Sequence, residues 1–289
     1  MTQVTNPTTP ASSLSGGVGG GGFTVIGTQG DNRLNGGPGN DIIQTFGAND
    51  VIAGGSGNDL IITGGGNDSV GGGDGNDTII SGSGSDVVAG GTGDDFIFGG
   101  KGDDLVDGGD GNDLVSGDRG NDTVLGGSGS DTVFGGQGND VVGGGDGNDT
   151  LYGGKDNDTV NGGAGNDLIS GDRGSDVLTG GAGSDTFYFF SSGGDYGVDT
   201  ITDFTPTEDK IKLKTTGGGV FGGLGTALEA SEFVVVSGFN AATPGTTTTN
   251  KLVYDPTNGA LYFNGSSGVL TIAQLQPGLT ITTNNFELF

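Results

Sequence analysis

The nonapeptides GGPGNDIIQ (36–44), GGSGNDLII (54–62), GGDGNDTII (72–80) and GGDGNDTLY (144–152) show the pattern that decides the fold. The same nine-residue period runs from Gly36 to Tyr188 without insertion or deletion and makes 17 consecutive repeats, numbered 1 to 17 below. A degenerate unit, GTQGDNRLN (27–35), precedes them. The sixth position is Asp in every repeat, and the eighth is apolar in every repeat, from Ile43 to Phe187. A fixed period of this kind indicates a repeat architecture.

Each position of the repeat predicts a local conformation. Glycines at positions 1, 2 and 4 permit positive φ angles and a tight turn. Positions 7 to 9 alternate outward, inward and outward, which predicts a three-residue strand with its middle side chain buried. One repeat is then a turn plus a strand, and two repeats make one coil of a right-handed parallel β-helix. The predicted class is all-β, with two facing sheets whose nine coils, at roughly 4.8 Å each, extend for about 43 Å.

The charge balance predicts that cations take part in this fold. The chain has 36 Asp and Glu against 9 Lys and Arg, a formal net charge of −27, and neither His nor Cys. One aliphatic side chain per repeat makes only a thin core, while stacked coils place Asp above Asp, which is repulsive. Carboxylate and carbonyl oxygens suit a hard ion with six or more ligands, and Mg²⁺ resists such all-protein cages. We therefore expect Ca²⁺ to be part of the structure.

The predicted calcium ligands are the aspartates at position 6. A plain turn-forming role would also admit Asn or Ser there, and neither occurs. An ion between the turns of repeats n and n+2 would give about 15 sites along the stack. The predicted ligand set is Asp41, Asp50, Asp59, Asp68, Asp77, Asp86, Asp95, Asp104, Asp113, Asp122, Asp131, Asp140, Asp149, Asp158, Asp167, Asp176 and Asp185.

Composition also excludes several classes of function. The acidic balance argues against nucleic acid, which needs a basic surface, and no apolar run is long enough for a membrane-spanning helix. The absence of His and Cys excludes the usual zinc, thiol and Ser-His-Asp enzymes. The acids outside the ligand set that could act on a polysaccharide are Asp107, Asp110 and Asp146, beside Lys101, Lys155 and Tyr152. Solvated turn residues explain them more simply, so we expect no enzyme activity.

The pattern G-G-x-G-x-D-x-U-x, met almost unit for unit over 36–188, resembles that of the RTX, or hemolysin-type calcium-binding, family. The resemblance implies a calcium-bound parallel β-roll that is unfolded inside the cell and folded outside it. It also implies export through type I secretion machinery that recognises an uncleaved C-terminal signal. The expected location is extracellular, with association to the cell surface left open.

Some repeats depart from the family pattern. Thr45, Phe46 and Ala48 stand where repeat 2 should have glycine, so calcium sites shared by that turn are in doubt. Asp also replaces glycine at 118, 156 and 172, where it tolerates unusual φ angles better than most residues.

The predicted domain organisation has three parts: a flexible Thr/Ser/Gly-rich segment at 1–26, the roll at 27–188, and a C-terminal cap and secretion-signal region at 189–289. Within the last part, 197–213 resembles the stretch that closes the roll in RTX proteases and lipases. The matching acids are Asp199, Asp203 and Asp209, and the side chains expected to cover the core end are Ile201, Phe204, Ile211 and Leu213. Short strands are predicted at 233–236, 251–254, 260–263, 269–272 and 279–282, with a hairpin turn at 255–259 and a helical turn near 227–233.

The functional prediction is a secreted calcium-binding RTX protein with a structural, surface or self-assembling role. The alternative is a secretion-and-folding module, or a glycan- or cell-envelope-binding module, that acts with a separate effector. Position 9 of the odd repeats carries Phe98, Phe134 and Tyr152 on one predicted outer face. Such a face suits self-association or an envelope glycan, unless the C-terminal region covers it.

Overall fold

The computed structural model describes residues 2–5, 12–15, 21–189, 197–214, 228–229, 232–238, 251–265 and 268–289. The chain divides into two compact units, Met1–Leu151 and Tyr152–Phe289, each described by itself below. Within the described residues, the 3₁₀ helix η1 (Thr283–Asn285) is the one helical element, so the predicted all-β class is confirmed. No described helix has the length and hydropathy needed to cross a bilayer.

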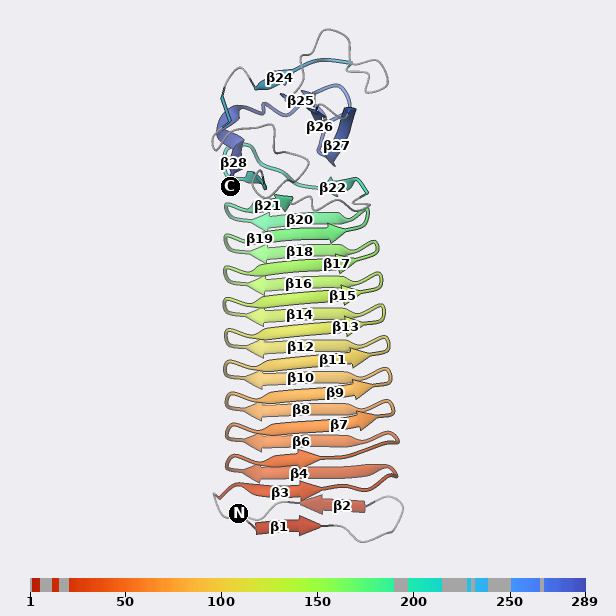
Figure 1. The fold of residues 1–289 in the computed structure, drawn as a ribbon. Coiled ribbons are helices and arrows are strands. Elements are labelled where there is room, and N and C mark those ends of the chain that lie inside the picture. Colours follow the sequence, from red (N-terminus) through yellow and green to blue (C-terminus); the bar gives the residue numbers. More distant parts are fainter. Residues whose placement is uncertain are drawn as a thin grey trace. The chain divides into compact units, whose positions relative to one another are not determined.

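The first unit is a stack of coils built from two parallel sheets (Figure 1). Each strand pairs in parallel with the strand two places along the chain, as a two-strand coil requires. One sheet contains β1 (Thr2–Thr5), β3 (Phe23–Ile26), β5 (Ile42–Gln44), β7 (Leu60–Gly65), β9 (Thr78–Ser83), β11 (Phe96–Lys101), β13 (Leu114–Arg119) and β15 (Thr132–Gln137). The other contains β2 (Ser12–Ser15), β4 (Asn32–Pro38), β6 (Val51–Ser56), β8 (Ser69–Asp74), β10 (Val87–Thr92), β12 (Leu105–Asp110), β14 (Thr123–Ser128) and β16 (Val141–Asp146).

Most strands of the roll have six residues rather than the predicted three. They continue from positions 7–9 of one repeat through positions 1–3 of the next, so both position 8 and the following position 1 point inward. The strand pairing is irregular at position 1. Ala53 pairs with Gly71 and Gly55 pairs with Gly73, but Gly54 has no partner in the pairing of β6 with β8. The position-1 residue is therefore buried but does not take part in the regular strand pairing.

The ordered stack begins earlier than the sequence predicted. The segment 1–26, expected to be flexible, contains β1, β2 and β3. Val25 is completely buried and pairs with Ile43, and Leu34 of the degenerate unit is also buried. Alternation of apolar residues in 23–26 could have indicated this strand, but the missing glycine pattern obscured it.

The turns show why position 2 favours glycine. Gly91 has φ +120°, and a Cβ there would lie 2.0 Å from the carbonyl oxygen of Gly73 in the neighbouring coil. Asp118, Asp156 and Asp172 adopt positive φ angles of 72°, 78° and 66°, so these turns form without glycine, as the tolerance of Asp predicted.

The second unit combines further coils with an antiparallel meander. One sheet runs in the order β18 (Thr159–Ala164), β20 (Val177–Ala182), β22 (Asp199–Ile201), β27 (Gly268–Gln274), β26 (Ala260–Gly265), β25 (Lys251–Asp255) and β24 (Phe233–Val235). The other contains β19 (Leu168–Arg173), β21 (Thr186–Phe189), β23 (Lys210–Leu213) and β28 (Phe286–Leu288). The strand β17 (Thr150–Lys155) falls at the division between the units. The predicted hairpin is confirmed, because β25 and β26 pair antiparallel around residues 256–259.

The tail predictions are partly confirmed. Strands lie where four of the five were expected, at β24, β25, β26 and β27. The strand predicted at 279–282 is wrong: Thr282 instead caps η1, its hydroxyl accepting the Asn284 N–H, and the strand follows as β28. Residues 227, 230 and 231 of the predicted helical turn lie outside the described residues.

The side chains expected to close the core are buried. Ile201, Phe204, Ile211 and Leu213 are each at most 2% exposed, and the ring of Phe204 lies 6.0 Å from that of Phe187 between centroids. The apolar closure predicted for 197–213 is therefore present in the second unit.

Candidate metal centre

The position-6 aspartates form two ladders, one on each edge of the roll. The backbone N–H of Asp41 donates to Oδ1 of Asp59 at 2.7 Å, and Asp59 donates to Asp77 in the same way. On the opposite edge Asp50 N–H donates to Oδ1 of Asp68 at 2.8 Å. We call these the odd-repeat edge and the even-repeat edge. All 17 predicted aspartates are buried, none more than 3% exposed.

The second carboxylate oxygen of these residues, Oδ2, differs from Oδ1 in its hydrogen bonding. In the first unit, the Oδ2 atoms of the position-6 aspartates from Asp41 to Asp131 are buried and have no hydrogen-bond partner among the described residues. A buried carboxylate oxygen without a partner costs considerable free energy. A regular row of such atoms indicates that a cation completes the structure.

The electrostatics of the ladders point the same way. Burial raises the pKa of Asp95 and Asp104 to about 7 and that of Asp59 and Asp122 to about 6. A backbone hydrogen bond partly offsets burial at each, while neighbouring aspartates raise the pKa further. These carboxylates resist ionisation together unless positive charge is supplied.

Glycine at position 1 allows each Oδ2 atom to approach the backbone closely. A Cβ on Gly54 would lie 2.4 Å from Oδ2 of Asp59 and 2.5 Å from the carbonyl oxygen of Gly72 in the next coil, both too close for a side chain. On Gly72 the equivalent distances are 2.3 Å to Oδ2 of Asp77 and 2.5 Å to the carbonyl oxygen of Gly90. A carboxylate oxygen and a backbone carbonyl oxygen thus lie near one another at each of these turns. Both are donor types that calcium prefers.

Carboxylates alone do not make a complete site. Across the part of the chain that the structure describes, no three acidic side chains converge on one point. Since Ca²⁺ takes six or more oxygens, most ligands have to be backbone carbonyls from the turns. Glycine-rich turns provide these carbonyls without side-chain obstruction.

The closing segment continues both ladders in the second unit. Asp199 Oδ1 accepts the N–H of Asp176 at 3.1 Å, and Asp209 Oδ1 accepts that of Asp185 at 3.0 Å. Asp203 accepts instead from the N–H groups of Gly180 and Gly181, at 2.9 and 2.8 Å. Burial raises the pKa of Asp199, and the nearby Asp176 carboxylate raises it further.

The N-terminal ends of the ladders were missed by the sequence reasoning. Asn32, at position 6 of the degenerate unit, is buried and donates its N–H to Oδ1 of Asp50 at 2.7 Å. Phe23 N–H donates to Oδ1 of Asp41 at 2.6 Å. Alignment of 27–35 with the repeat could have identified Asn32, whereas nothing in the sequence singles out Phe23.

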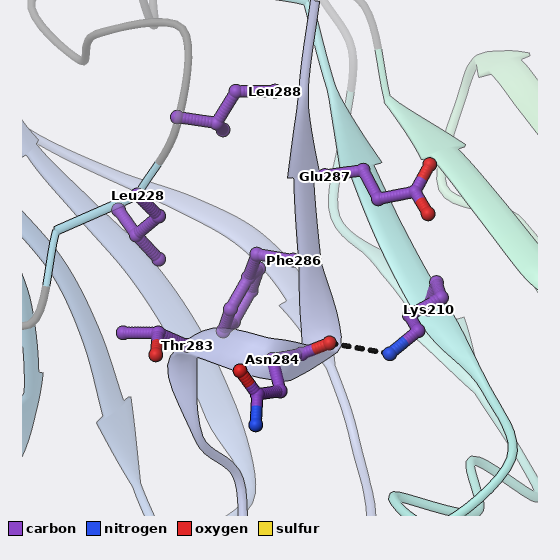
Figure 2. A pocket seen from close by; sticks show the side chains of 7 residues that line it. All are labelled: Lys210, Leu228, Thr283, Asn284, Phe286, Glu287 and Leu288. Atoms are coloured by element: carbon purple, nitrogen blue, oxygen red, sulfur yellow. Dashed lines mark hydrogen bonds between the residues drawn. The ribbon is translucent and has the colours of Figure 1, made fainter.

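The acids considered for catalysis lie on the surface of the roll. Asp107, Asp110 and Asp146 are exposed, as are Lys101 and Lys155. A cavity of about 620 Å³ lies in the second unit, lined by Lys210, Leu228, Thr283, Asn284, Phe286, Glu287 and Leu288 (Figure 2). The Lys210 ammonium there donates to the carbonyl oxygen of Asn284 at 2.5 Å, so this cation supports the tail backbone.

Large apolar side chains are exposed on both outer faces of the roll. Phe98 and Phe134 on the odd-repeat strands are half-buried. Exposed large apolar side chains lie on both sheets of the first unit: Ile42, Ile80 and Phe96 on one, and Val51, Val87, Leu105, Leu125 and Val141 on the other. Apolar exposure is therefore not confined to the odd-repeat face.

Comparison with known proteins agrees with this geometry. The family model of the RTX calcium-binding nonapeptide repeat matches residues 18–45, 26–59, 44–79, 80–115, 108–142, 116–151, 143–169 and 161–189. A comparison with curated proteins gives no match. Among solved structures, the AlgE6R3 subunit of the Azotobacter vinelandii mannuronan C5-epimerase is 24% identical, with 57% of this chain and 77% of that one covered and a TM-score of 0.30. The extracellular lipase LipA of Serratia marcescens is 19% identical, with 99% of this chain and 42% of that one covered and a TM-score of 0.23. The chain belongs to the RTX calcium-binding nonapeptide repeat family.

Proposed function

We propose that this chain is a secreted protein whose roll folds when calcium binds between the stacked turns. The position-6 aspartates, Asp41 through Asp185, supply the carboxylate ligands, and turn carbonyls supply the rest. The ion provides the positive charge that two stacked carboxylates need. The observation that carries the proposal is the row of buried, unpartnered Oδ2 atoms in the first unit.

Equilibrium dialysis of the full chain tests calcium binding directly. We expect several Ca²⁺ ions per chain, up to about 15, and little competition from Mg²⁺ at the same concentration, because Mg²⁺ dehydrates reluctantly. Binding of at most one calcium ion per chain would contradict the proposal.

Export by type I secretion machinery is the second part of the proposal. Low intracellular calcium would keep the roll unfolded and able to pass through a channel, and the tail would carry the signal. Deleting 279–289 should retain the protein inside a host with that machinery, whereas deleting 2–12 should not. Equal secretion of both truncated chains would show that the signal lies elsewhere.

The exposed apolar side chains on both sheets of the first unit support a structural or self-assembling role. Light scattering in calcium tests it with Phe98→Ser/Phe134→Ser on one face and Leu105→Ser/Leu125→Ser on the other. If the chain self-associates through the odd-repeat face, only the first pair of substitutions should reduce the association. A monomeric wild type would remove this role and favour a module that acts with a separate effector or glycan.

A further inference from the structure

Three hydroxyl side chains lie where other repeats have glycine. Position 1 is glycine in every odd repeat, but repeats 2, 4 and 6 carry Thr45, Thr63 and Ser81. The three side chains are consecutive on the even-repeat edge of the first unit and are at most 1% exposed. A buried hydroxyl has to find a hydrogen-bond partner, so its position in the stack is informative.

The three hydroxyls form a ladder of their own. Thr45 Oγ1 donates to the carbonyl oxygen of Thr63 at 2.8 Å, and Thr63 Oγ1 donates to that of Ser81 at 2.5 Å. Ser81 Oγ donates to the carbonyl oxygen of Gly99 at 2.8 Å. Each accepting carbonyl belongs to position 1 of the next coil on that edge. In glycine-type turns the equivalent carbonyl, such as Gly72 O beside Gly54, lies close to the position-1 glycine together with the Asp Oδ2 atom.

The side chains also occupy a position where glycine-type turns leave no room for a Cβ. A Cβ on Gly27 would lie 2.7 Å from Cγ2 of Thr45, so the Thr45 methyl group points towards the preceding coil while its hydroxyl points towards the following one. Beside Gly54, in contrast, the atoms that a Cβ would meet are Oδ2 of Asp59 and the carbonyl oxygen of Gly72. The three side chains on the even-repeat edge are therefore incompatible with the oxygen arrangement of the glycine-type turns on the odd-repeat edge.

We propose that this hydroxyl ladder replaces calcium at three positions, between the turns of repeats 2, 4, 6 and 8 on the even-repeat edge. The inference rests on the calcium binding proposed above and specifies which turns carry ions. Two of the hydroxyls also interact with the carboxyl groups beside them, Thr45 with Asp50 and Ser81 with Asp86. The occupied carbonyl and the side chain at position 1 therefore distinguish the two edges.

Counting bound ions tests the proposal. Full-length wild type and T45G/T63G/S81G are dialysed to equilibrium in saturating Ca²⁺, and calcium per chain is measured by atomic emission. We expect three more ions per chain in the variant, because glycine at position 1 releases the carbonyls and allows the oxygen arrangement of the glycine-type turns. An unchanged or lower number in a variant whose circular dichroism matches that of wild type overturns the proposal.

The reciprocal variant decides the question if the first one does not fold. G54T/G72T/G90S places the same side chains on the odd-repeat edge, where position 1 is glycine and a Cβ would displace the neighbouring oxygens. We expect three fewer ions per chain, and an unchanged number overturns the proposal. A wild type that binds no calcium would instead refute the proposed function itself, so the two failures are distinguishable.

Discussion

At the scale of the residue, each position-6 Asp has two separate tasks. Its Oδ1 atom accepts a backbone N–H from the preceding coil, as Asp59 does from Asp41. Its Oδ2 atom lies against the position-1 glycine and, as at Asp59, is buried without a hydrogen-bond partner among the described residues. Asn could perform the first task but brings no negative charge for the second. This division explains why position 6 is invariant while position 5, exposed at the turn, varies among Asn, Asp and Ser.

Asp95→Asn should separate these tasks. The amide keeps an oxygen that can accept the Asp77 N–H, but calcium loses a charged ligand, and ligand charge tunes affinity. We expect the calcium concentration at the folding midpoint to rise about five- to tenfold. Asp94→Asn is the matched control, because Asp94 is exposed and its Oδ1 accepts only from Asn112. Equal midpoints for the two variants would contradict the ligand role.

Acid should partly substitute for calcium. Burial raises the pKa of Asp95 and Asp104 to about 7, above the value near 4 of an unfolded Asp. Folding therefore favours the protonated form of these two carboxyl groups. Their contribution to the stability of the fold is complete below about pH 4 and is lost as pH rises through about 7. In chelator, circular dichroism should show more β structure at pH 4 than at pH 8. An equally disordered chain at both pH values would contradict the conclusion that burial raises the pKa of these aspartates.

At the scale of the element, the strand is longer than its apolar pattern suggests. Alternation predicted positions 7–9, and the structure adds positions 1–3 of the next repeat. Glycines have no side chain to alternate, so their strand character is invisible to a hydropathy pattern. The hydroxyl ladder could not be predicted from the sequence for a similar reason. Thr45 differs from the glycine expected at position 1, but only the stacking of the coils shows that Thr63 and Ser81 share its role.

Within β11 two neighbouring apolar residues should differ sharply. Ile97 is completely buried and Phe96 is 52% exposed. Ile97→Ala should reduce the free energy of unfolding by roughly 2–5 kcal/mol through lost packing and a cavity. Phe96→Ala should change it by no more than about 0.5 kcal/mol. Urea unfolding at saturating calcium measures both, and similar losses would contradict the assigned strand orientation.

The closing segment is the other element with a measurable role. Asp203 accepts from the N–H groups of Gly180 and Gly181, so Asp203→Ala removes two charge-assisted hydrogen bonds. We expect a loss of about 1–3 kcal/mol in local stability. Glu208→Ala, at a nearby exposed position, is the control. Hydrogen exchange of residues 177–189 should accelerate only in Asp203→Ala. Unchanged exchange in this variant would contradict a stabilising role for Asp203.

At the scale of the whole molecule, the sequence predicted the fold class, the length of the structural repeat and the buried aspartates, because the nine-residue pattern occurs 17 times. It predicted less where the repeat stops. The apolar run at 279–282 suggested a strand, but Thr282 caps η1 and the Leu279 N–H donates to the Tyr254 hydroxyl at 3.1 Å. These tertiary contacts override a local preference that appears only once.

A chain with a net charge of −27 should not hold its stacked carboxylates together without calcium. Circular dichroism of the full chain at pH 7.5, first in chelator and then with increasing Ca²⁺, tests this requirement. We predict a disordered spectrum in chelator and a cooperative gain of β structure between roughly 0.1 and 1 mM Ca²⁺, with no comparable gain in Mg²⁺. A full β spectrum in chelator, unchanged when calcium is added, would contradict it.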